Sequence, residues 1–457
     1  MFLDREHSIA PADFNRWRVP PAALAIHLSI GQAYAFSVFN LPLSTLVGMG
    51  KSAPGDWKLS TIGWIFSTAI AVLGLSAFTF GRWLEDAGPR KAMFAAAVCF
   101  AGGFFVAALG VRLHEIWIVY LGYGVLGGVG LGLGYISPVS TLIKWFPDRP
   151  GMATGLAIMG FGGGAMIGSP LAVALMAHFK TPTSMGVAEA FMAMGAIYFV
   201  FMMFGVFTVR LPAPGWVPDG AKPEARQPEA GAVARATGTP PAPDVHVDEA
   251  IKTRQFWLLW AVLCLNVTAG IGVLGQASPM IQEMFPGVIN AAAAAGFVGL
   301  LSLANMIGRF AWSSCSDLIG RRATYMVFFV LGAVLYASVP TIGRTSVVVF
   351  VALYAVILSM YGGGFATIPA YLRDTFGVMH VGAIHGRLLT AWSVAGVAGP
   401  VLVNYIREYQ VAHGVAKANA YSVTMYIMAG LLVAGFIANF LVTPVDPSRH
   451  WRGAKNV

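Results

Sequence analysis

The sequence is divided into long apolar stretches separated by short polar loops, and the number of these stretches limits the folds open to the chain. A helix needs about 20 apolar residues to cross a bilayer. Apolar residues make up 57% of the chain and charged residues 11%, whereas about 25% of the residues of a soluble domain are charged. We therefore predict an all-α membrane protein of twelve transmembrane helices. The stretches fall at about 19–46, 60–84, 91–111, 116–143, 150–178, 186–210, 254–284, 291–317, 323–343, 346–372, 382–407 and 420–443.

The positive charges predict the orientation of these helices. Lys and Arg crowd into alternate loops, and by the positive-inside rule the loops that are rich in them are cytoplasmic. This set contains Arg5, Arg16, Arg18, Arg82, Arg90, Lys91, Lys144, Arg149, Arg321, Arg322, Arg373, Arg387, Arg449, Arg452 and Lys455. Both termini are then cytoplasmic, and the formal charge of +9 needs no nucleic-acid partner. Residues 1–17 lack the apolar core and cleavage site of a signal peptide, so a cytoplasmic tail is expected.

A composition shift divides the chain into three regions. Residues 211–252 hold eight prolines among Gly, Ala and charged residues. Such a segment favours a semi-extended linker with no core of its own. We predict a six-helix bundle over 1–210, a cytoplasmic linker over 211–252 and a second six-helix bundle over 253–457. A multi-pass position in a bacterial inner membrane, surrounded by lipid, follows from this arrangement, and the chain is expected to act as a monomer.

The two predicted bundles repeat one loop pattern. After the second stretch, Gly81 is followed by a carboxylate at Glu85, a glycine at Gly88 and a cation at Arg90. After the eighth stretch the same spacing joins Ser313, Asp317, Gly320, Arg321 and Arg322. Glu85 and Asp317 are 232 residues apart, as are Gly88 and Gly320. Later pairs keep nearly the same register, namely Pro138 with Pro369, Phe146 with Phe376, Gly155 with Gly386 and Pro170 with Pro400. The register indicates an internal duplication, which is a known plan of transporters.

The repeated small-x-x-x-Asp/Glu-x-x-Gly loop resembles the cytoplasmic motif of the major facilitator superfamily. Four other segments of the chain resemble one family of that superfamily, the oxalate/formate antiporter family, which is a relative of the monocarboxylate transporters. They are 31–39 (GQAYAFSVF), 144–149 (KWFPDR), 159–164 (MGFGGG) and 266–270 (NVTAG). The resemblance implies alternating access between two bundles. It also implies a cytoplasmic gate at Gly81, Glu85, Gly88, Arg90, Asp317, Gly320 and Arg321. One departure is that Glu85 is followed by Asp86, where such transporters usually carry Asp followed by a cation.

Arg309 is the residue that most strongly indicates a substrate site. It lies eight residues before Asp317, and at 1.5 Å per residue this places it roughly 12 Å deep, near the middle of a core about 30 Å thick. The corresponding residue of the first half is Ala77, so the gate does not require a cation there. An unpaired guanidinium in a membrane interior is costly and usually faces a partner or a polar path. Its planar fork suits a carboxylate. Snorkelling to the headgroups, or a place in the salt bridges of the gate, remains an alternative.

Other residues are expected at the same depth. Asn305 lies one turn from Arg309 on the same helix face, and the pair matches a spacing that contacts substrate in the monocarboxylate transporters. Tyr135, Tyr34, Tyr361 and Trp392 are candidate contacts for a carboxylate and its short carbon chain, with simple packing between helices as the alternative. His27 appears as the only histidine clearly inside a stretch. It is a possible proton relay, or else a packing residue.

The predicted function is a secondary active transporter of small organic anions, most simply monocarboxylates such as lactate, pyruvate or formate. An oxalate/formate-type exchanger and a non-transporting nutrient sensor are the alternatives. In the family's oxalate carrier a lysine follows the Thr-Ala of the eleventh helix, whereas this chain has Trp392 after Thr390 and Ala391. A single fixed cation at Arg309 then favours monoanions over oxalate. An enzyme is not indicated, and neither a cofactor nor a metal site is expected.

Overall fold

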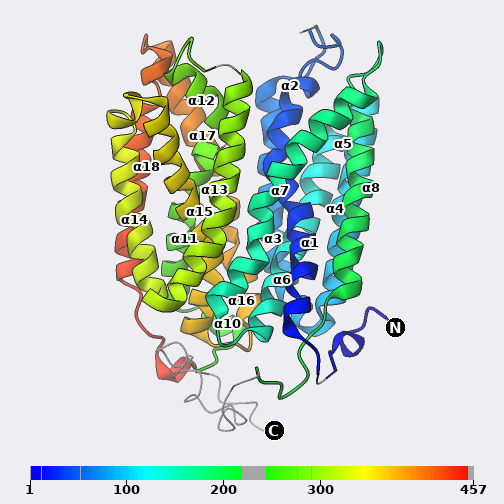
Figure 1. Cartoon of the computed structure of the whole chain (residues 1–457), viewed down its shortest axis with the longest axis vertical. Coiled ribbons are helices and arrows are strands. Elements are labelled where there is room, and N and C mark those ends of the chain that lie inside the picture. Colours follow the sequence, from blue (N-terminus) through cyan, green and yellow to red (C-terminus); the bar gives the residue numbers. More distant parts are fainter. Residues whose placement is uncertain are drawn as a thin grey trace.

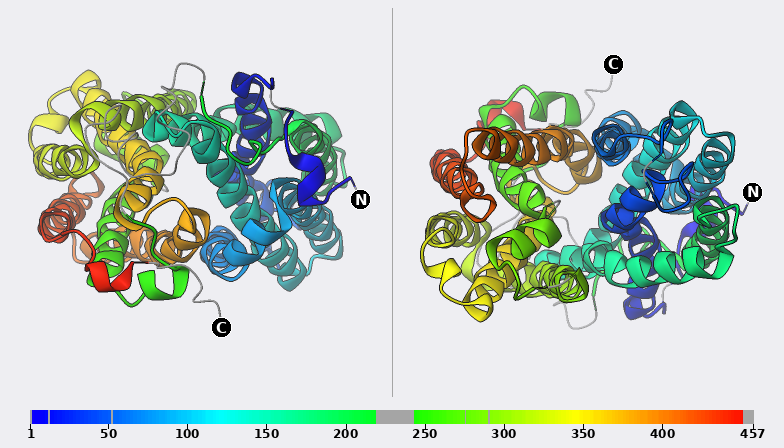
Figure 2. Two further views of the ribbon diagram at one scale, coloured as in Figure 1. Left: turned by 90° about the horizontal axis from the view of Figure 1, so that it is seen from below. Right: turned by 90° about the horizontal axis from the view of Figure 1, so that it is seen from above.

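The computed structural model describes residues 2–11, 13–51, 53–218, 243–274, 276–289 and 291–450. These residues are almost entirely helical, and the long helices run roughly side by side along one axis (Figure 1). Seen from either end, the first and second halves of the sequence form two groups that lie next to each other (Figure 2). The first and last described segments of the chain lie at the same end of the molecule, as the even number of predicted spans requires (Figure 1).

The first group contains six spans, two of which are interrupted. The first span begins as an α-helix and continues as a 3-10 helix from Gly31, and the fourth contains a π-helical turn. Its elements are α1 (Pro20–Ile30), η3 (Gly31–Phe39), α2 (Asn40–Leu43), α3 (Leu59–Ala87), α4 (Pro89–Leu113), α5 (Ile116–Val119), η4 (Tyr120–Leu126), α6 (Gly127–Trp145), α7 (Pro150–Phe179) and α8 (Val187–Thr208).

The second group repeats this order. The eleventh span of the chain is also interrupted, at Leu389, which directly follows the end of the short helix that carries His385. The elements are α11 (Arg254–Leu274), α12 (Ala277–Met284), α13 (Ala291–Ile319), α14 (Arg321–Ser338), α15 (Val347–Phe376), α16 (Val381–Leu388), α17 (Thr390–Ala412) and α18 (Ser422–Phe440).

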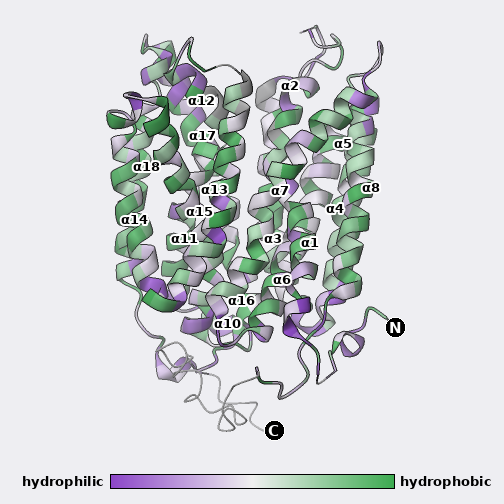
Figure 3. Cartoon of the chain, viewed as in Figure 1, coloured by the Kyte–Doolittle hydropathy of each residue, from purple (hydrophilic) through white to green (hydrophobic). Residues whose placement is uncertain are grey.

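The outer faces of the helices suit a bilayer. In the described ranges, nine helices are long and apolar enough to cross a membrane. The interrupted first span, α13 with its buried Arg309, and α14 with its two leading arginines complete the two sets of six. Hydrophobic residues cover the outward sides of α8, α14 and α18, and hydrophilic residues gather at the two ends (Figure 3). The predicted all-α membrane fold of twelve helices is therefore confirmed.

The two groups meet mainly through α7 against α13 and through α3 against α16 and α17. Glycines bring these helices into close contact, as small residues do at helix interfaces in membranes. A Cβ on Gly155 would lie 2.2 Å from the Ser313 hydroxyl, and one on Gly386 would lie 2.4 Å from the Ala77 carbonyl oxygen. Gly155 and Gly386 are one of the pairs related by the duplication, so the repeat places a close approach at both halves of the interface.

The end of the predicted linker is better packed than its composition suggests. Residues 219–242 lie outside the described residues, but residues 243–250 are described and include the short helix α10 (Val247–Ala250). The Val245 amide donates to the Phe376 carbonyl at 2.9 Å, and the side chains of Val245 and Val247 are buried. The prediction of a linker without a core is therefore wrong for this stretch, because its apolar side chains fold back onto the loop after α15.

A carboxylate of this stretch contacts both halves of the molecule. Asp248 accepts a hydrogen bond of 2.5 Å from Arg387 and lies 3.9 Å from the Arg82 guanidinium. The Arg387 guanidinium lowers the pKa of the Asp248 carboxyl. Nearby, the rings of His246 and His380 lie 4.9 Å apart, and partial burial lowers the pKa of His380, with His246 adding to the effect.

Candidate substrate site and cytoplasmic gate

Arg309 lies fully buried on α13, at the boundary between the two halves. Its Nε donates to Asn305 Oδ1 at 2.9 Å, and Nη1 donates to the Ile158 carbonyl of α7 at 3.4 Å. The guanidinium carbon is 5.5 Å from the centre of the Phe161 ring and 5.2 Å from that of Phe365. One phenylalanine comes from each half, so the cation is held between two aromatic faces.

The charge of Arg309 has no partner of opposite sign. None of the ion pairs found in the described ranges includes it, and its Nη2 has no hydrogen-bond partner. A buried charge that lacks a counter-ion is costly. The structure therefore contradicts the alternative in which Arg309 belongs to the salt bridges of the gate, and the buried side chain does not reach a surface.

The predicted aromatic residues come together beside this cation. The Trp392 ring centre lies 5.2 Å from that of Tyr135 and 6.3 Å from that of Tyr34. It also lies 5.3 Å from the Phe161 ring and 4.4 Å from the Phe365 ring, which are the two rings that flank Arg309. Residues from α6, α7, α13, α15 and α17 thus meet at one place between the halves.

Tyr361, the remaining predicted tyrosine, contacts the cluster through Tyr34. The Tyr34 and Tyr361 hydroxyls are 3.0 Å apart, and this hydrogen bond joins η3 of the first half to α15 of the second. Tyr361 is buried and Tyr34 is half-buried. The structure brings together the six predicted site residues in a single layer of contacts: Arg309, Asn305, Tyr135, Tyr34, Trp392 and Tyr361.

Several polar atoms in this layer lack protein partners. They include Arg309 Nη2, Tyr135 Oη and Trp392 Nε1, and all three side chains are completely buried. Tyr135 and Arg309 lie close enough to interact, but no protein atom in the described ranges meets the geometry of a hydrogen bond with the Tyr135 hydroxyl. About 90% or more of buried polar groups in proteins are hydrogen-bonded, so three unmatched donors in one layer, one of them on the cation, are exceptional.

Sequence reasoning missed part of this layer. Phe161 belongs to the 159–164 segment that carried the family resemblance, yet its contact with Arg309 depends on how α7 packs on α13. His385 was also missed, and the expectation that His27 is the only histidine inside a span is wrong. His385 is 1% exposed, because the short helix α16 packs into the molecule against α3 and α6.

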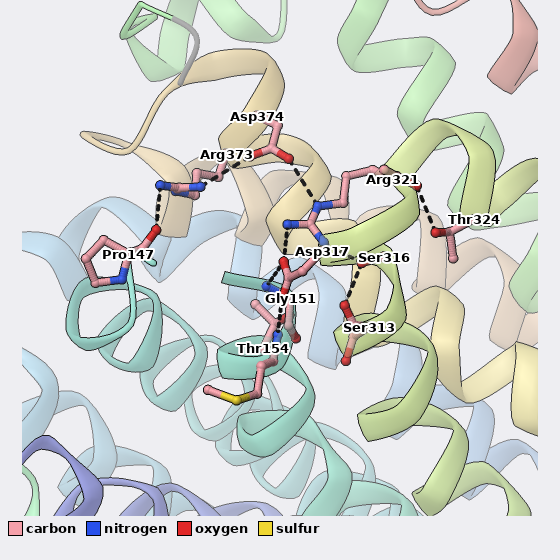
Figure 4. A network of polar contacts seen from close by, with 12 residues as sticks. Pro147, Gly151, Thr154, Ser313, Ser316, Asp317, Arg321, Thr324, Arg373 and Asp374 are labelled. Atoms are coloured by element: carbon pink, nitrogen blue, oxygen red, sulfur yellow. Dashed lines mark hydrogen bonds and ion pairs between the residues drawn. The ribbon is translucent and has the colours of Figure 1, made fainter. Parts of the chain in front are cut away.

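The gate of the second half centres on Asp317 (Figure 4). Its two carboxylate oxygens accept hydrogen bonds from the Gly151 and Met152 amides, at 2.9 and 3.0 Å, at the start of α7 in the other half. The Arg321 guanidinium binds Asp317 at 2.5 Å and Asp374 at 3.1 Å. A carboxylate at a helix N-terminus is favourable, so this arrangement ties α13 to α7.

The gate of the first half has a different set of charges. Glu85 pairs with Lys144 at 2.7 Å and accepts from the Ser140 hydroxyl at 3.1 Å. A Cβ on Gly382 would lie 2.4 Å from Glu85 Oε1, so this carboxylate faces the start of α16, as Asp317 faces the start of α7. In the second half, Arg321 lies between two carboxylates, Asp317 and Asp374. By the register of the repeat, Lys144 corresponds to Asp374. Glu85 therefore pairs directly with a lysine, and no arginine is needed to join two acids.

Arg90 does not act as part of this gate in the structure. It donates to the Phe2 and His7 carbonyls at 3.1 and 2.8 Å, and so holds the N-terminal tail against α4. The prediction that Arg90 belongs to the cytoplasmic gate is therefore wrong in this structure, because its guanidinium binds the N-terminal tail and not a gate carboxylate. Gly88 and Gly320 have φ angles of 85° and 86° at the turns between α3 and α4 and between α13 and α14. Only glycine adopts such angles readily, which explains why the repeat keeps both.

Known proteins share this architecture. The model described as Major Facilitator Superfamily matches residues 22–400 and 288–456. The chain is 26% identical to the oxalate:formate antiporter of Oxalobacter formigenes over 387 residues, or 84% of this chain and 83% of the antiporter. It is 25% identical to apicoplast pyruvate carrier 1 of Toxoplasma gondii over 396 residues, or 73% of this chain and 68% of the carrier.

A solved structure agrees with this fold. The Escherichia coli fucose:proton symporter superposes on 94% of this chain and on all of its own, with a TM-score of 0.64 and 13% identity. The resemblance to the oxalate/formate antiporter family that the sequence indicates is confirmed by the antiporter similarity. The chain belongs to the Major Facilitator Superfamily of membrane transporters.

Proposed function

We propose that this transporter exchanges small carboxylate anions across a bacterial inner membrane by binding the carboxylate group at Arg309. The observation that carries the proposal is the unpaired, fully buried guanidinium with unmatched donors beside it, on Tyr135 and Trp392. A carboxylate that arrives there supplies the missing negative charge and accepts from these donors. Charge-assisted hydrogen bonds of this kind are about twice as strong as neutral ones.

The surroundings favour an anion with a short carbon chain. Phe161, Phe365 and Trp392 pack around the cation with ring centres 4.4–5.3 Å from one another where they touch. An anion that binds at Arg309 would therefore meet apolar walls, which suit a chain of a few carbon atoms. The site lies between the halves, and alternating access would follow from one half rocking against the other about the bound anion.

Exchange is favoured over the simple monocarboxylate transport that the sequence placed first. The similarity to an oxalate:formate antiporter covers more of both chains than the similarity to a pyruvate carrier. The monocarboxylate carrier remains the second candidate, because one fixed cation at Arg309 matches one carboxylate. In both cases the first anion to test is a small one such as formate.

Counterflow in proteoliposomes tests the proposal. Vesicles that contain the purified protein and unlabelled formate should accumulate labelled formate from outside, whereas vesicles without internal anion should take up little. Equal uptake with and without internal anion would favour the monocarboxylate carrier. Saturable binding without any uptake would identify the sensor alternative and would contradict the transport proposal.

A further inference from the structure

Two buried histidines lie on either side of Tyr135, close to the proposed anion site. His27 comes from α1, its Nε2 lies 3.1 Å from the Tyr135 carbonyl oxygen, and its ring centre is 5.3 Å from the Tyr135 ring. His385 comes from α16 in the other half, with its ring centre 5.9 Å from that of Tyr135. Their exposed fractions are 0% and 1%, and His27 Nδ1 and His385 Nε2 have no partner.

These imidazoles belong to the same layer as Arg309. The His27 ring centre lies 6.4 Å from that of Phe161, and the same Phe161 ring lies beneath the Arg309 guanidinium at 5.5 Å. Tyr135 contacts both histidines and Trp392. An anion that accepts from the unmatched atoms of Tyr135 and Trp392 would therefore lie next to a pair of titratable groups.

The charged and titratable groups around the two histidines leave them without a carboxylate. Tyr135 packs against both rings, and His27 lies within electrostatic range of Arg309 and of His385. The charged groups nearest along α16 are Arg387, Asp248, Glu85 and Lys144. Glu85 is paired with Lys144, and Asp248 with Arg387. In the part of the chain that the structure describes, no hydrogen bond or ion pair joins a carboxylate to either imidazole. A negative charge for them has to come from a bound anion.

Charge balance then decides which anions the site accepts. A monoanion at Arg309 brings the net charge of the site to zero. A dianion leaves one uncompensated negative charge away from water, which is costly. One protonated imidazole beside Arg309 restores a net charge of zero, because histidine is the side chain that gains a proton most readily near neutral pH.

We propose that His27 and His385 form a proton site that lets the transporter carry a small dicarboxylate dianion together with one proton, in place of a monoanion alone. This inference rests on the proposed function. One dianion and one proton carry a net charge of −1, as one monoanion does, so exchange of the two is electroneutral. Linkage is reciprocal: a proton on the pair strengthens dianion binding by the factor by which the dianion strengthens proton binding.

Competition at two pH values tests the proton site. Proteoliposomes loaded with formate take up labelled formate while oxalate is added outside, at about pH 6 and about pH 8, where both acids are ionised because their carboxyl pKa values lie near 4 or below. For one coupled proton, the oxalate concentration that halves uptake should fall by up to about tenfold per unit of acidification. Unlabelled formate should show little change between the two pH values.

Matched variants separate the proton site from general effects of pH. The double variant His27→Gln with His385→Gln should lose the pH dependence of oxalate inhibition. His413→Gln, at an exposed position beyond the end of α17, should retain it. A dye trapped inside the vesicles should record about one proton entering with each oxalate exchanged for formate, and none during exchange of formate for formate.

A second variant, Trp392→Lys, tests the proposal even if the double histidine variant fails to fold. Trp392→Lys places a permanent cation in the same layer, so oxalate should inhibit equally at both pH values and enter without a proton, even when both histidines are present. The proposal is overturned if oxalate inhibition depends on pH in the same way with and without the histidines, or if no proton accompanies oxalate. Failure of the unmodified protein to exchange any small carboxylate would instead overturn the proposed function.

Discussion

Asp317 Oδ1 in the second half accepts a 2.9 Å hydrogen bond from the Gly151 amide in the first half. The bond joins the end of α13 in one group of helices to the start of α7 in the other (Figure 4). Asp317 Oδ2 accepts a second bond from Met152 at 3.0 Å. A carboxylate of one half thus binds the N-terminus of a helix of the other, at the side that we expect to be cytoplasmic.

Asp317→Asn should open this side more often. The substitution removes the charge from two hydrogen bonds and from the pair with Arg321, and bonds to charged groups contribute about 1.5–3 kcal/mol each. We expect a shift of about tenfold or more toward the cytoplasm-open state. A cysteine at Ala383, which is buried against Gly81, should react faster with a thiol reagent from the cytoplasmic side.

The control for this experiment is Glu189→Gln. Glu189, in the first turn of α8, pairs with Arg112, in the last turn of α4, outside the predicted gate. Its loss should leave the reactivity of the cysteine at position 383 unchanged. Equal acceleration by both variants would mean that Asp317 does not hold the gate.

Removal of an unmatched hydroxyl should affect binding more than stability. Tyr135→Phe deletes an Oη that has no protein partner, so the thermal stability of the empty protein should be unchanged or slightly higher. Anion affinity should fall by about fivefold to tenfold, as expected for one lost hydrogen bond of about 1 kcal/mol or slightly more. Tyr336→Phe deletes a hydroxyl that donates to the Ala269 carbonyl at 2.8 Å. This variant should lower the thermal stability and leave the anion affinity unchanged. Thermal shift and binding titrations on both variants check this contrast.

The docked end of the linker should loosen in acid. The pKa of His380 is lowered in the folded protein, so folding disfavours its protonated form. Docking is then strongest above the ordinary histidine value of about 6.5 and weakens as the pH falls below it. Exchange of the Val245 amide hydrogen, corrected for the intrinsic effect of pH, should accelerate between about pH 7.5 and about pH 5.5. His380→Gln should flatten this response, and a response that persists in the variant would exclude His380 as its source.

The orientation of the chain is open to direct labelling. Cysteines at Lys252 and Ser448, both exposed, should react only with reagents on the cytoplasmic side. Lys180 and Lys417 lie at exposed positions in the alternate loops, which are poor in Lys and Arg. Cysteines at these two positions should react only with reagents on the outside. Labelling of position 252 from outside would overturn the twelve-helix arrangement.

The sequence predicts the fold well because each span has its own apolar stretch and the gate loops repeat with a constant spacing. Arg309, Asn305 and Trp392 could be placed by counting residues along a helix, since depth depends only on rise per residue. Contacts between helices could not be found in this way. Three findings depend on which faces of separate helices meet. They are the contact of Arg309 with Phe161, the binding of Arg90 to the N-terminal tail and the burial of His385.

The packed end of the linker illustrates the same limit. Its prolines and charges indicate an extended chain, but Val245 and Val247 are buried where the chain meets the loop after α15. Two apolar side chains are too few to stand out in a segment of that composition. Their docking depends on a surface that only the folded second half provides.

Uptake by Arg309 variants tests the central claim most directly. In the formate counterflow assay, Arg309→Ala should abolish accumulation of labelled formate while the protein still inserts and purifies. Arg309→Lys should recover little, because an ammonium group lacks the planar fork of the guanidinium. Arg112→Ala, at an exposed position, should transport normally. Formate accumulation by Arg309→Ala at the rate of the unmodified protein would contradict the proposal that this buried cation binds the transported anion.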